Sequence, residues 1–396
     1  MKILFVTPRI PYPLDTGAKI RTFNLLKSVS RSNDVCLLSF DFDGDANAQE
    51  NLKKLGITIV PVKAKEGMKL LSIFSDTPVV IDKYYSRQMV DAIQNTVSIN
   101  KFDLAHFDHL HMGQYRRYLD GMPCVLDEHN VESMMTERCS KMERNVVRKA
   151  LFGLQAGKMA NIESAMIQQF SRCLAVSGND KDALMRISDG KARVEVVPNG
   201  VDTEYFKGQG SGVRGQGEKN AIVFTGSMDW LPNEDAVTYF CSDILPLVWK
   251  EKPRATFYIV GKNPSKNVKA LMGRDNRIIV TGTVDDVRPY LQSSKVCVVP
   301  LRIGGGTRLK ILEALAMEKA VVATSIGAEG LATRQGEHLL IADDPGDFAR
   351  AVIRLIDDEN LRTKLGSRGR ELVIEKYDWK VVGKTLNDIY TQVVGG

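Results

Sequence analysis

Short apolar runs alternate with stretches of helical periodicity along all 396 residues of the chain. The runs are rich in Val, Ile and Leu without polar alternation, which is typical of strands buried on both faces of a parallel sheet. Their alternation with helices predicts repeated βαβ units and an α/β fold. The predicted strands are Lys2–Val6, Asp34–Ser39, Thr58–Pro61, Leu104–Phe107, Cys124–Leu126, Arg172–Val176, Val194–Val197, Ala221–Thr225, Thr256–Val260, Ile278–Thr281, Val296–Pro300, Ala320–Thr324 and His338–Ile341.

Two segments interrupt this alternation. Between Asn145 and Phe170 apolar residues recur at helical spacing, which predicts a long helix packed on the first sheet; a membrane-surface role is the secondary interpretation. Lys207–Asn220 contains five glycines and almost nothing apolar, so we expect a surface connection. A domain boundary near Asn199 and Gly200 follows, since 396 residues exceed one usual core. We expect ligands to bind in the cleft between two domains.

Composition and charge exclude several classes of protein. The 43% hydrophobic and 26% charged residues are ordinary for a globular protein, and the net charge of +6 forms no basic stripe with aromatics. We therefore expect no nucleic-acid partner. The scattered basic clusters favour a solvated surface or, alternatively, a patch for an anionic membrane or a charged acceptor. Six widely spaced cysteines fit no zinc pattern. With neither a signal peptide nor an apolar run of about 20 residues, we expect a cytoplasmic protein.

The strongest candidate for chemistry follows the predicted strand that ends at Pro300. Three glycines here let a ligand approach the backbone closely, and the helix that begins after them offers free amides. Two cations and the positive end of the helix dipole add positive charge. The pattern predicts a cradle for a diphosphate; the alternative is a tight turn with solvated cations. Glu313, one turn into the helix, is placed to accept hydrogen bonds from ribose hydroxyls, or is an ordinary exposed glutamate. The predicted cradle comprises Gly304, Gly305, Gly306, Thr307, Arg308, Leu309 and Lys310.

Two polar clusters follow consecutive strands of the first half. They are His106–His111, which includes Asp108 and His109, and Asp127–Glu132, which includes His129. Ligand-binding groups of open α/β sheets gather at the carboxyl ends of strands, and carboxylates and imidazoles suit proton transfer at an acceptor hydroxyl. The alternative is helix capping and core packing, which we favour for His106. The spacing is not that of a zinc site, and we expect no metal.

The segment from Pro300 to Leu331 resembles the donor-binding signature of retaining glycosyltransferases of family 4, which have the GT-B fold. That fold consists of two Rossmann-like αβα domains facing each other across a cleft. Further resemblances extend the match over nearly the whole chain. They are Val196–Phe206 to the interdomain segment, Val280–Leu291 to the nucleobase loop, and Tyr377–Trp379 to the start of a last helix that returns to the first domain. The implied domains are residues 1–198 and 199–375, with residues 376–396 as that helix.

The resemblance also implies site residues. Asp108 and His109 fall at the family's acid and imidazole position near the reacting centre, and His129 at a second position. Arg21 faces either the cleft or the solvent. The donor would contact the glycine loop at Gly17, Gly226 after the eighth strand, the cradle with Glu313, and the nucleobase loop at Thr281, Thr283 and Val284. The family needs no metal or other cofactor.

The chain departs from the family pattern at three places. The family has two glutamates eight positions apart; Glu313 matches the second, but Gly305 stands at the first. The stretch Phe224–Asn233 lacks the usual Arg and Lys, so neutralisation of the diphosphate falls more heavily on Arg308 and Lys310. Finally, Glu318 and Ala320 replace a usual Gly and Pro, which we interpret as a local change of turn.

We therefore expect a retaining transferase that moves a sugar from a UDP- or GDP-sugar to a hydroxyl of a glycan, lipid-linked or small-molecule acceptor. Polysaccharide or glycolipid synthesis is the expected role, with peripheral association at the inner face of a membrane. Two alternatives remain: a nucleotide-sugar epimerase of the same architecture, and a non-catalytic subunit that binds nucleotide or polysaccharide.

Overall fold

The computed structural model describes residues 1–42, 44, 46–63, 77–143, 145–207, 220–304 and 307–395. It divides into two compact units, Met1–Asn199 with Trp379–Gly396, and Gly200–Asp378. Within the described ranges, none of the helices combines the length and the apolar character that crossing a bilayer requires.

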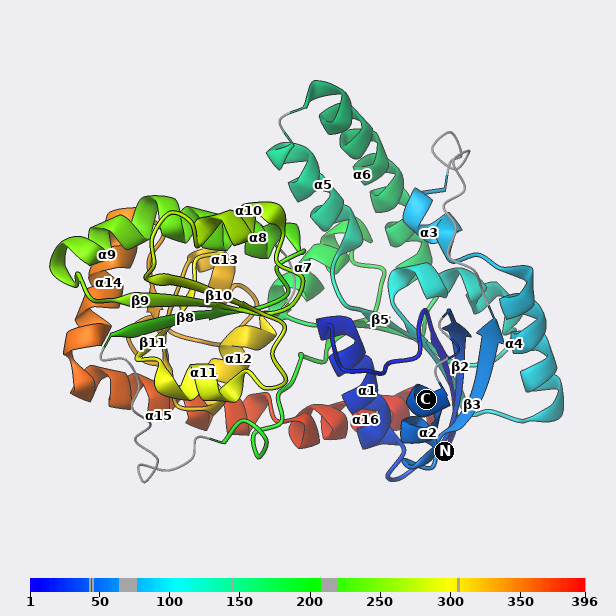
Figure 1. Ribbon diagram of the computed structural model, residues 1–396. Coiled ribbons are helices and arrows are strands. Elements are labelled where there is room, and N and C mark those ends of the chain that lie inside the picture. Colours follow the sequence, from blue (N-terminus) through cyan, green and yellow to red (C-terminus); the bar gives the residue numbers. More distant parts are fainter. Residues whose placement is uncertain are drawn as a thin grey trace. The chain divides into compact units, whose positions relative to one another are not determined.

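The first unit is built on a parallel sheet of seven strands in the order β3-β2-β1-β4-β5-β6-β7 (Figure 1). Apolar side chains of both sheet faces are buried, as the unalternated strand sequences predict. The strands are β1 (Lys2–Thr7), β2 (Asp34–Asp41), β3 (Thr58–Lys63), β4 (Leu104–Asp108), β5 (Cys124–Glu128), β6 (Arg172–Ala175) and β7 (Val194–Val196).

Helices of the first unit cover its sheet and include one from the end of the chain. Trp379, Leu386 and Tyr390 of this last helix are buried in the same cluster as Ile3 and Phe5 of β1. The helices are α1 (Gly17–Val29), α2 (Ala46–Lys53), α3 (Val79–Lys83), α4 (Arg87–Ile99), the 3₁₀ helix η2 (Leu110–Tyr118), α5 (Glu132–Met142), α6 (Val146–Ile167), α7 (Gly178–Ile187) and α16 (Trp379–Gly395).

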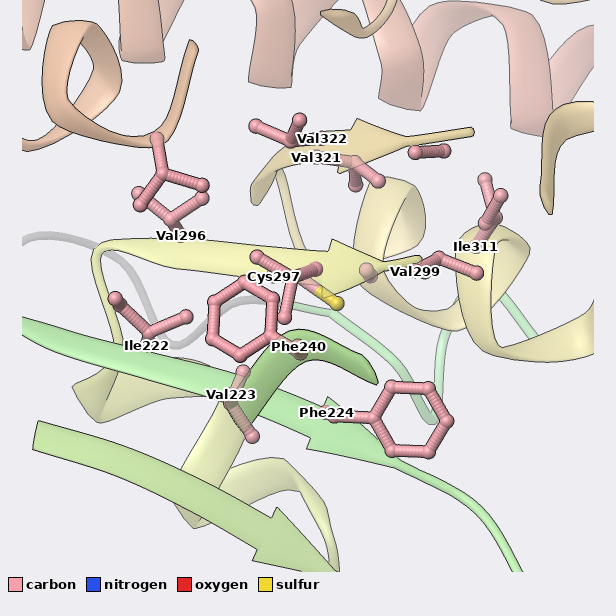
Figure 2. Close-up of a cluster of buried hydrophobic side chains, with 14 of the residues drawn as sticks. Ile222, Val223, Phe224, Phe240, Val296, Cys297, Val299, Ile311, Val321 and Val322 are labelled. Atoms are coloured by element: carbon pink, nitrogen blue, oxygen red, sulfur yellow. The ribbon is translucent and has the colours of Figure 1, made fainter. Parts of the chain in front are cut away.

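The second unit has a parallel sheet of six strands in the order β10-β9-β8-β11-β12-β13. Side chains from β8, β11 and β12 interleave with Phe240 and Ile311 in its fully buried core (Figure 2). The strands are β8 (Ala221–Thr225), β9 (Thr256–Val260), β10 (Ile278–Gly282), β11 (Val296–Val299), β12 (Ala320–Ala323) and β13 (Leu340–Ile341). The helices are α8 (Leu231–Tyr239), the π-helix η3 (Phe240–Ile244), α9 (Leu245–Glu251), α10 (Lys266–Leu271), α11 (Arg288–Ser293), α12 (Leu309–Ala316), α13 (Ser325–Ala328), α14 (Pro345–Asp357) and α15 (Glu359–Lys376).

Each predicted strand is present, which confirms the α/β class, and most of their ends agree to within one or two residues. The prediction for the long helix was wrong in one respect. α6 forms, but only its second half packs onto the unit, where Met159, Met166 and Ile167 are buried. Val147 and Leu154 of the first half are 69% and 54% exposed. Helical spacing of apolar residues predicts a helix but not which of its turns find a partner.

Candidate functional site

Both sheets place a candidate site where the order of their strands reverses. In the first unit β1 lies beside β4, and in the second β8 lies beside β11, with the chain proceeding outward in opposite directions on either side. In open parallel sheets the loops diverge at this point and leave a crevice at the carboxyl ends of the strands. Gly17 follows β1 and Asp108 ends β4 in the first unit. In the second, Gly226 follows β8 and Arg308 follows β11. Each unit therefore gathers predicted site residues at its own reversal point.

In the second unit the predicted cradle begins at Gly304 and ends in the first turn of α12. Gly304 has φ 146°, and an added Cβ would lie 2.6 Å from a terminal guanidinium nitrogen of Arg308. Glycine is thus required for the Arg308 side chain to lie against the backbone of the turn. Arg308 also donates to the carbonyl of Ile326 at 3.5 Å. Gly305 and Gly306, also predicted for the cradle, lie outside the described residues.

Lys310 lies at the centre of this reversal point, and the direct contacts of its Nζ are with neutral groups. Its Nζ donates to Oδ1 of Asn233 at 2.7 Å and lies 3.8 Å from the centroid of the Phe224 ring. Asn233 in turn donates from Nδ2 to the carbonyl of Ser227 at 2.8 Å. Burial lowers the pKa of Lys310 to about 7, and the Arg308 charge adds to this effect. The Glu313 carboxyl acts in the opposite direction, and an anion bound here would strengthen that effect.

Two glycines make this arrangement sterically feasible. An added Cβ at Gly226 would lie 2.8 Å from both Asn233 Nδ2 and Lys310 Nζ. At Gly261, after β9, it would lie 1.8 Å from the carbonyl oxygen of Gly226. The strand ends therefore approach closely only because both residues lack side chains. Gly226 was predicted as a site residue, whereas Gly261 and Asn233 were not, because only the folded contacts reveal their roles.

The remaining predicted donor residues of the second unit lie on the same edge of its sheet. Thr307 is buried before α12, and Leu309 packs against the core. Glu313 is partly buried on α12, and burial raises the pKa of its carboxyl to about 7, against the opposing charge of Lys310. The predicted nucleobase residues lie at the end of β10 and directly after it. Thr281 donates to the carbonyl of Gly282 at 2.9 Å, Thr283 is exposed, and Val284 packs against the core.

In the first unit the three predicted catalytic residues form one hydrogen-bonded group. Asp108 and Asp127 are paired across β4 and β5. One oxygen of Asp108 lies 2.8 Å from Nε2 of His129, and the other lies 3.0 Å from Nδ1 of His109. The second oxygen also accepts from Thr22 Oγ1 of α1 at 3.0 Å, across the reversal point. The rings of His109 and His129 are 3.7 Å apart.

Burial and neighbouring charges shift the pKa values of Asp108 and His129 in opposite directions. Burial alone would raise the pKa of Asp108, but the adjacent His109 and His129 hold it well below its usual value. Burial would likewise lower the pKa of His129, yet Asp108 outweighs that effect and raises it to about 9. The group therefore contains a carboxylate and an imidazolium at neutral pH. Asp108 is 2% exposed, whereas the His109 side chain is 16% exposed, so His109 is the member that a ligand can reach.

The backbone of His109 is strained. Its φ of 74° and ψ of 146° lie in a region that only glycine adopts without steric cost. The amide of His109 donates to the carbonyl of Asp127 at 2.9 Å, and its ring is held by Asp108. Such conformations persist where the surroundings enforce them, and they cluster at functional sites. The strained backbone therefore indicates a functional role for His109 more strongly than its position in the sequence does.

Arg21 was expected at the cleft or in solvent, but it is 1% exposed. It forms a two-pronged ion pair with Asp127, at 2.7 and 2.9 Å, and donates to the carbonyls of Val197 and Pro198. Burial would raise the pKa of Asp127, but the Arg21 charge lowers it well below its usual value. His106 packs in the core as predicted, stacked on Phe5 at 4.2 Å and hydrogen-bonded to Tyr390.

Asp108, His109 and His129 each offer a potential metal-ligand atom, all within 4.8 Å of one another. A metal ion would have to displace the hydrogen bonds between Asp108 and both histidines. The expectation that no metal is needed stays a prediction.

Comparison with known proteins identifies the family. The model described as Glycosyltransferase Family 4 matches residues 16–205, and the model described as Glycosyl transferases group 1 matches residues 219–358. Between them they cover most of the chain. This protein belongs to glycosyltransferase family 4 and has the GT-B fold. It is a transferase enzyme, which excludes the epimerase and the non-catalytic subunit.

Individual relatives of this glycosyltransferase are distant. An uncharacterised 44.6 kDa protein in the cps region of Klebsiella pneumoniae is 22% identical, over 97% of this chain and 98% of that protein. A phosphatidyl-myo-inositol mannosyltransferase of Mycobacterium tuberculosis is 30% identical over 50% of this chain, and the match spans only 54% of the mannosyltransferase.

Solved structures agree on the fold of the glycosyltransferase. Sucrose-phosphate synthase from Thermosynechococcus elongatus has a TM-score of 0.77 at 15% identity, over 100% of both chains. Anabaena HepE in complex with UDP has a TM-score of 0.72 at 15% identity, over 99% of this chain and 100% of that one. At such identities the likeness concerns the fold alone.

Proposed function

We propose that this glycosyltransferase moves a sugar, with retention of anomeric configuration, from a nucleoside diphosphate sugar to an acceptor hydroxyl. The observation that carries the donor assignment is the convergence of Gly226, Asn233 and Lys310 at the β8–β11 reversal point, beside Arg308. Two neighbouring cations, one of which directly contacts only neutral groups, suit a diphosphate at the carboxyl edge of a parallel sheet. UDP is the preferred nucleotide over GDP, since the Anabaena neighbour was solved in complex with UDP.

In the proposed reaction the bond between the anomeric carbon and the diphosphate breaks, and a bond to the acceptor oxygen forms on the same face. The acceptor proton passes to a leaving phosphate oxygen. Arg308, Lys310 and the first amides of α12 stabilise the charge that develops on the diphosphate. His109 contacts the acceptor hydroxyl, while Asp108 and His129 fix the orientation of its ring. This front-side route is the one that the family resemblance implies.

For the acceptor we propose a glycan or a lipid-linked glycan, presented at a membrane surface. Support comes from the mannosyltransferase relative, whose name specifies a lipid, phosphatidyl-myo-inositol, as its acceptor. The relative in the cps region is consistent with a role in the synthesis of polysaccharide.

A thermal-shift panel of UDP-, GDP- and ADP-sugars tests the donor assignment. A ligand at 100 times its Kd stabilises the native state by about 2.7 kcal/mol, so a donor raises Tm measurably. We expect UDP-sugars to do so in the unsubstituted protein and not in Arg308→Ala. Equal Tm values with and without every nucleotide-sugar would contradict the proposal. Proton NMR of the first product formed would show the configuration at the anomeric carbon and so test retention.

A further inference from the structure

The helical hairpin formed by α5 and α6 projects from the first unit (Figure 1). Its base is anchored in the core by Glu163, which is fully buried and accepts from the amides of Glu132 and Ser133 at 2.7 and 3.1 Å. Nearer the tip, Ser140 Oγ of α5 donates to the carbonyl of Lys149 on α6 at 3.0 Å. Asn145 caps α6 by accepting from the amide of Arg148. The hairpin is therefore a built element with defined contacts along its length.

The outer half of α6 exposes an apolar face that the fold leaves uncovered. Val147, Leu151 and Leu154 are 69%, 46% and 54% exposed. Their spacing of four and three residues places them on one side of the helix. The side that contacts α5 is marked by Lys149 and Gly153, near Ser140, and lies roughly opposite. Val146 and Phe152 add further exposed apolar surface. Contiguous exposed apolar residues of this kind mark interaction sites.

The charged residues of the hairpin indicate what kind of partner this face binds. Between Arg138 and Lys158 the sequence contains one acidic residue, Glu143, and six basic ones. One of the six, Lys141, forms an ion pair at 2.7 Å with Glu137, which directly precedes this stretch. Arg148 and Lys149 are both exposed. At 100° per residue, Arg148 flanks the apolar face, whereas Lys149 lies on the side towards α5. An apolar helical face flanked by cations matches the boundary between the headgroups and acyl chains of an anionic bilayer. The six basic residues are Arg138, Lys141, Arg144, Arg148, Lys149 and Lys158.

We propose that the α5–α6 hairpin is a membrane-binding element, which inserts the apolar face of α6 into a bilayer surface rich in anionic lipid. The cations attract the hairpin to the surface, and Val147, Leu151 and Leu154 enter the headgroup region. The exposed apolar face lies on the outer half of α6, away from the residues of both candidate sites, so lipid binding does not depend on the donor. Its purpose rests on the proposed function, because an enzyme held at the surface meets a lipid-linked acceptor there.

Vesicle flotation with the full chain tests the proposal, using phosphatidylcholine vesicles with and without phosphatidylglycerol. We expect binding only to the anionic vesicles. One basic residue near such a surface contributes roughly five-fold in partitioning. Arg148→Glu with Lys149→Glu should therefore weaken binding at least about ten-fold. Leu151→Ser with Leu154→Ser should weaken binding to a similar degree.

Matched controls separate surface chemistry from folding and from donor binding. Lys53→Glu with Lys54→Glu reverses two adjacent exposed cations at the end of α2 and directly after it. Ile99→Ser removes an apolar side chain that is 81% exposed. Both should float like the unsubstituted protein. The substitutions at Arg148 and Lys149 and at Leu151 and Leu154 are the tip variants. The UDP-induced shift in Tm should be unchanged in all of them, so flotation reports on lipid binding and Tm reports on donor binding. Equal flotation of tip and control variants, no flotation at all, or a tip-dependent dimer in sedimentation would overturn the proposal.

Discussion

Buried charge is handled differently at the reversal points of the two units. In the first unit Arg21 meets Asp127 and His129 meets Asp108, so each cation already has a carboxylate partner within the protein. In the second unit Lys310 donates to a neutral amide and lies over an aromatic ring. Paired charges stabilise the fold, whereas a cation that directly contacts only neutral groups is available to pair with an anion from solution. This contrast underlies the placement of the diphosphate on the second unit.

The largest effect should come from breaking the internal pair of the first unit. Arg21→Ala leaves Asp127 buried with only the more distant His129, at 3.5 Å, and removal of one member of a buried pair costs about 3–5 kcal/mol. Urea unfolding monitored by circular dichroism should show this loss. The matched control is Arg87→Ala in the exposed pair with Asp91, where the cost should stay below about 1 kcal/mol. Similar losses in the free energy of unfolding of the two variants would show that the buried pair stabilises the fold no more than the exposed pair does.

At the second unit the corresponding change should affect turnover instead of stability. Arg308→Ala removes a charge that stabilises the leaving diphosphate, and loss of one such group costs about 100- to 1,000-fold in kcat. Initial rates of UDP release in the presence of acceptor would measure it. Circular dichroism and Tm should stay close to those of the unsubstituted protein. Full activity at an equal folded fraction would contradict the assignment of the cradle.

The pKa of Lys310 makes a sharper test of the same contrast. A bound diphosphate favours the protonated lysine, so its pKa in the complex must exceed the value of about 7 in the free protein. The contribution of Lys310 to UDP affinity should be full below pH 7 and fall as pH rises above it, by up to about ten-fold per pH unit. Calorimetric titration at pH 7, 8 and 9 measures this. In Lys310→Met the UDP affinity at pH 7 should be lower, and it should no longer fall as pH rises. If the affinity of this variant falls with pH as before, a group other than Lys310 causes the pH dependence.

The smallest effect concerns the turn after α12. Glu318 has φ 57°, a conformation in which a side chain other than glycine costs about 1–2 kcal/mol. Glu318→Gly should therefore raise the free energy of unfolding by about 1 kcal/mol without altering UDP affinity. Glu318→Ala is the control, because it also removes the 3.7 Å contact with Arg370 but keeps the strain. Equal stabilities of the two variants would show that the turn is not strained.

The sequence allowed the strands to be predicted because each is an apolar run buried on both faces, as Val296–Val299 illustrates. It also indicated the cradle, because its glycines, cations and helix start are contiguous. The partners of these residues could not be predicted. Arg21 and Asp127 are 106 positions apart, and Lys310 and Asn233 are 77 apart. Such pairs depend on which strands become neighbours, and a single sequence contains no signal for that choice.

The exposure of α6 had a different cause. The apolar spacing of Val147, Leu151 and Leu154 is equally compatible with a covered and an uncovered face, so the prediction that the whole helix packs on the sheet was wrong. The surrounding cations were the one available signal, because a run of basic residues seldom lines a core.

A crystal structure of the protein soaked with UDP tests the central claim most directly. The account predicts that diphosphate oxygens lie within hydrogen-bonding distance of the Arg308 guanidinium and the Lys310 ammonium, beside Gly304 and the first turn of α12. UDP bound elsewhere, with this turn facing bulk water, would contradict it.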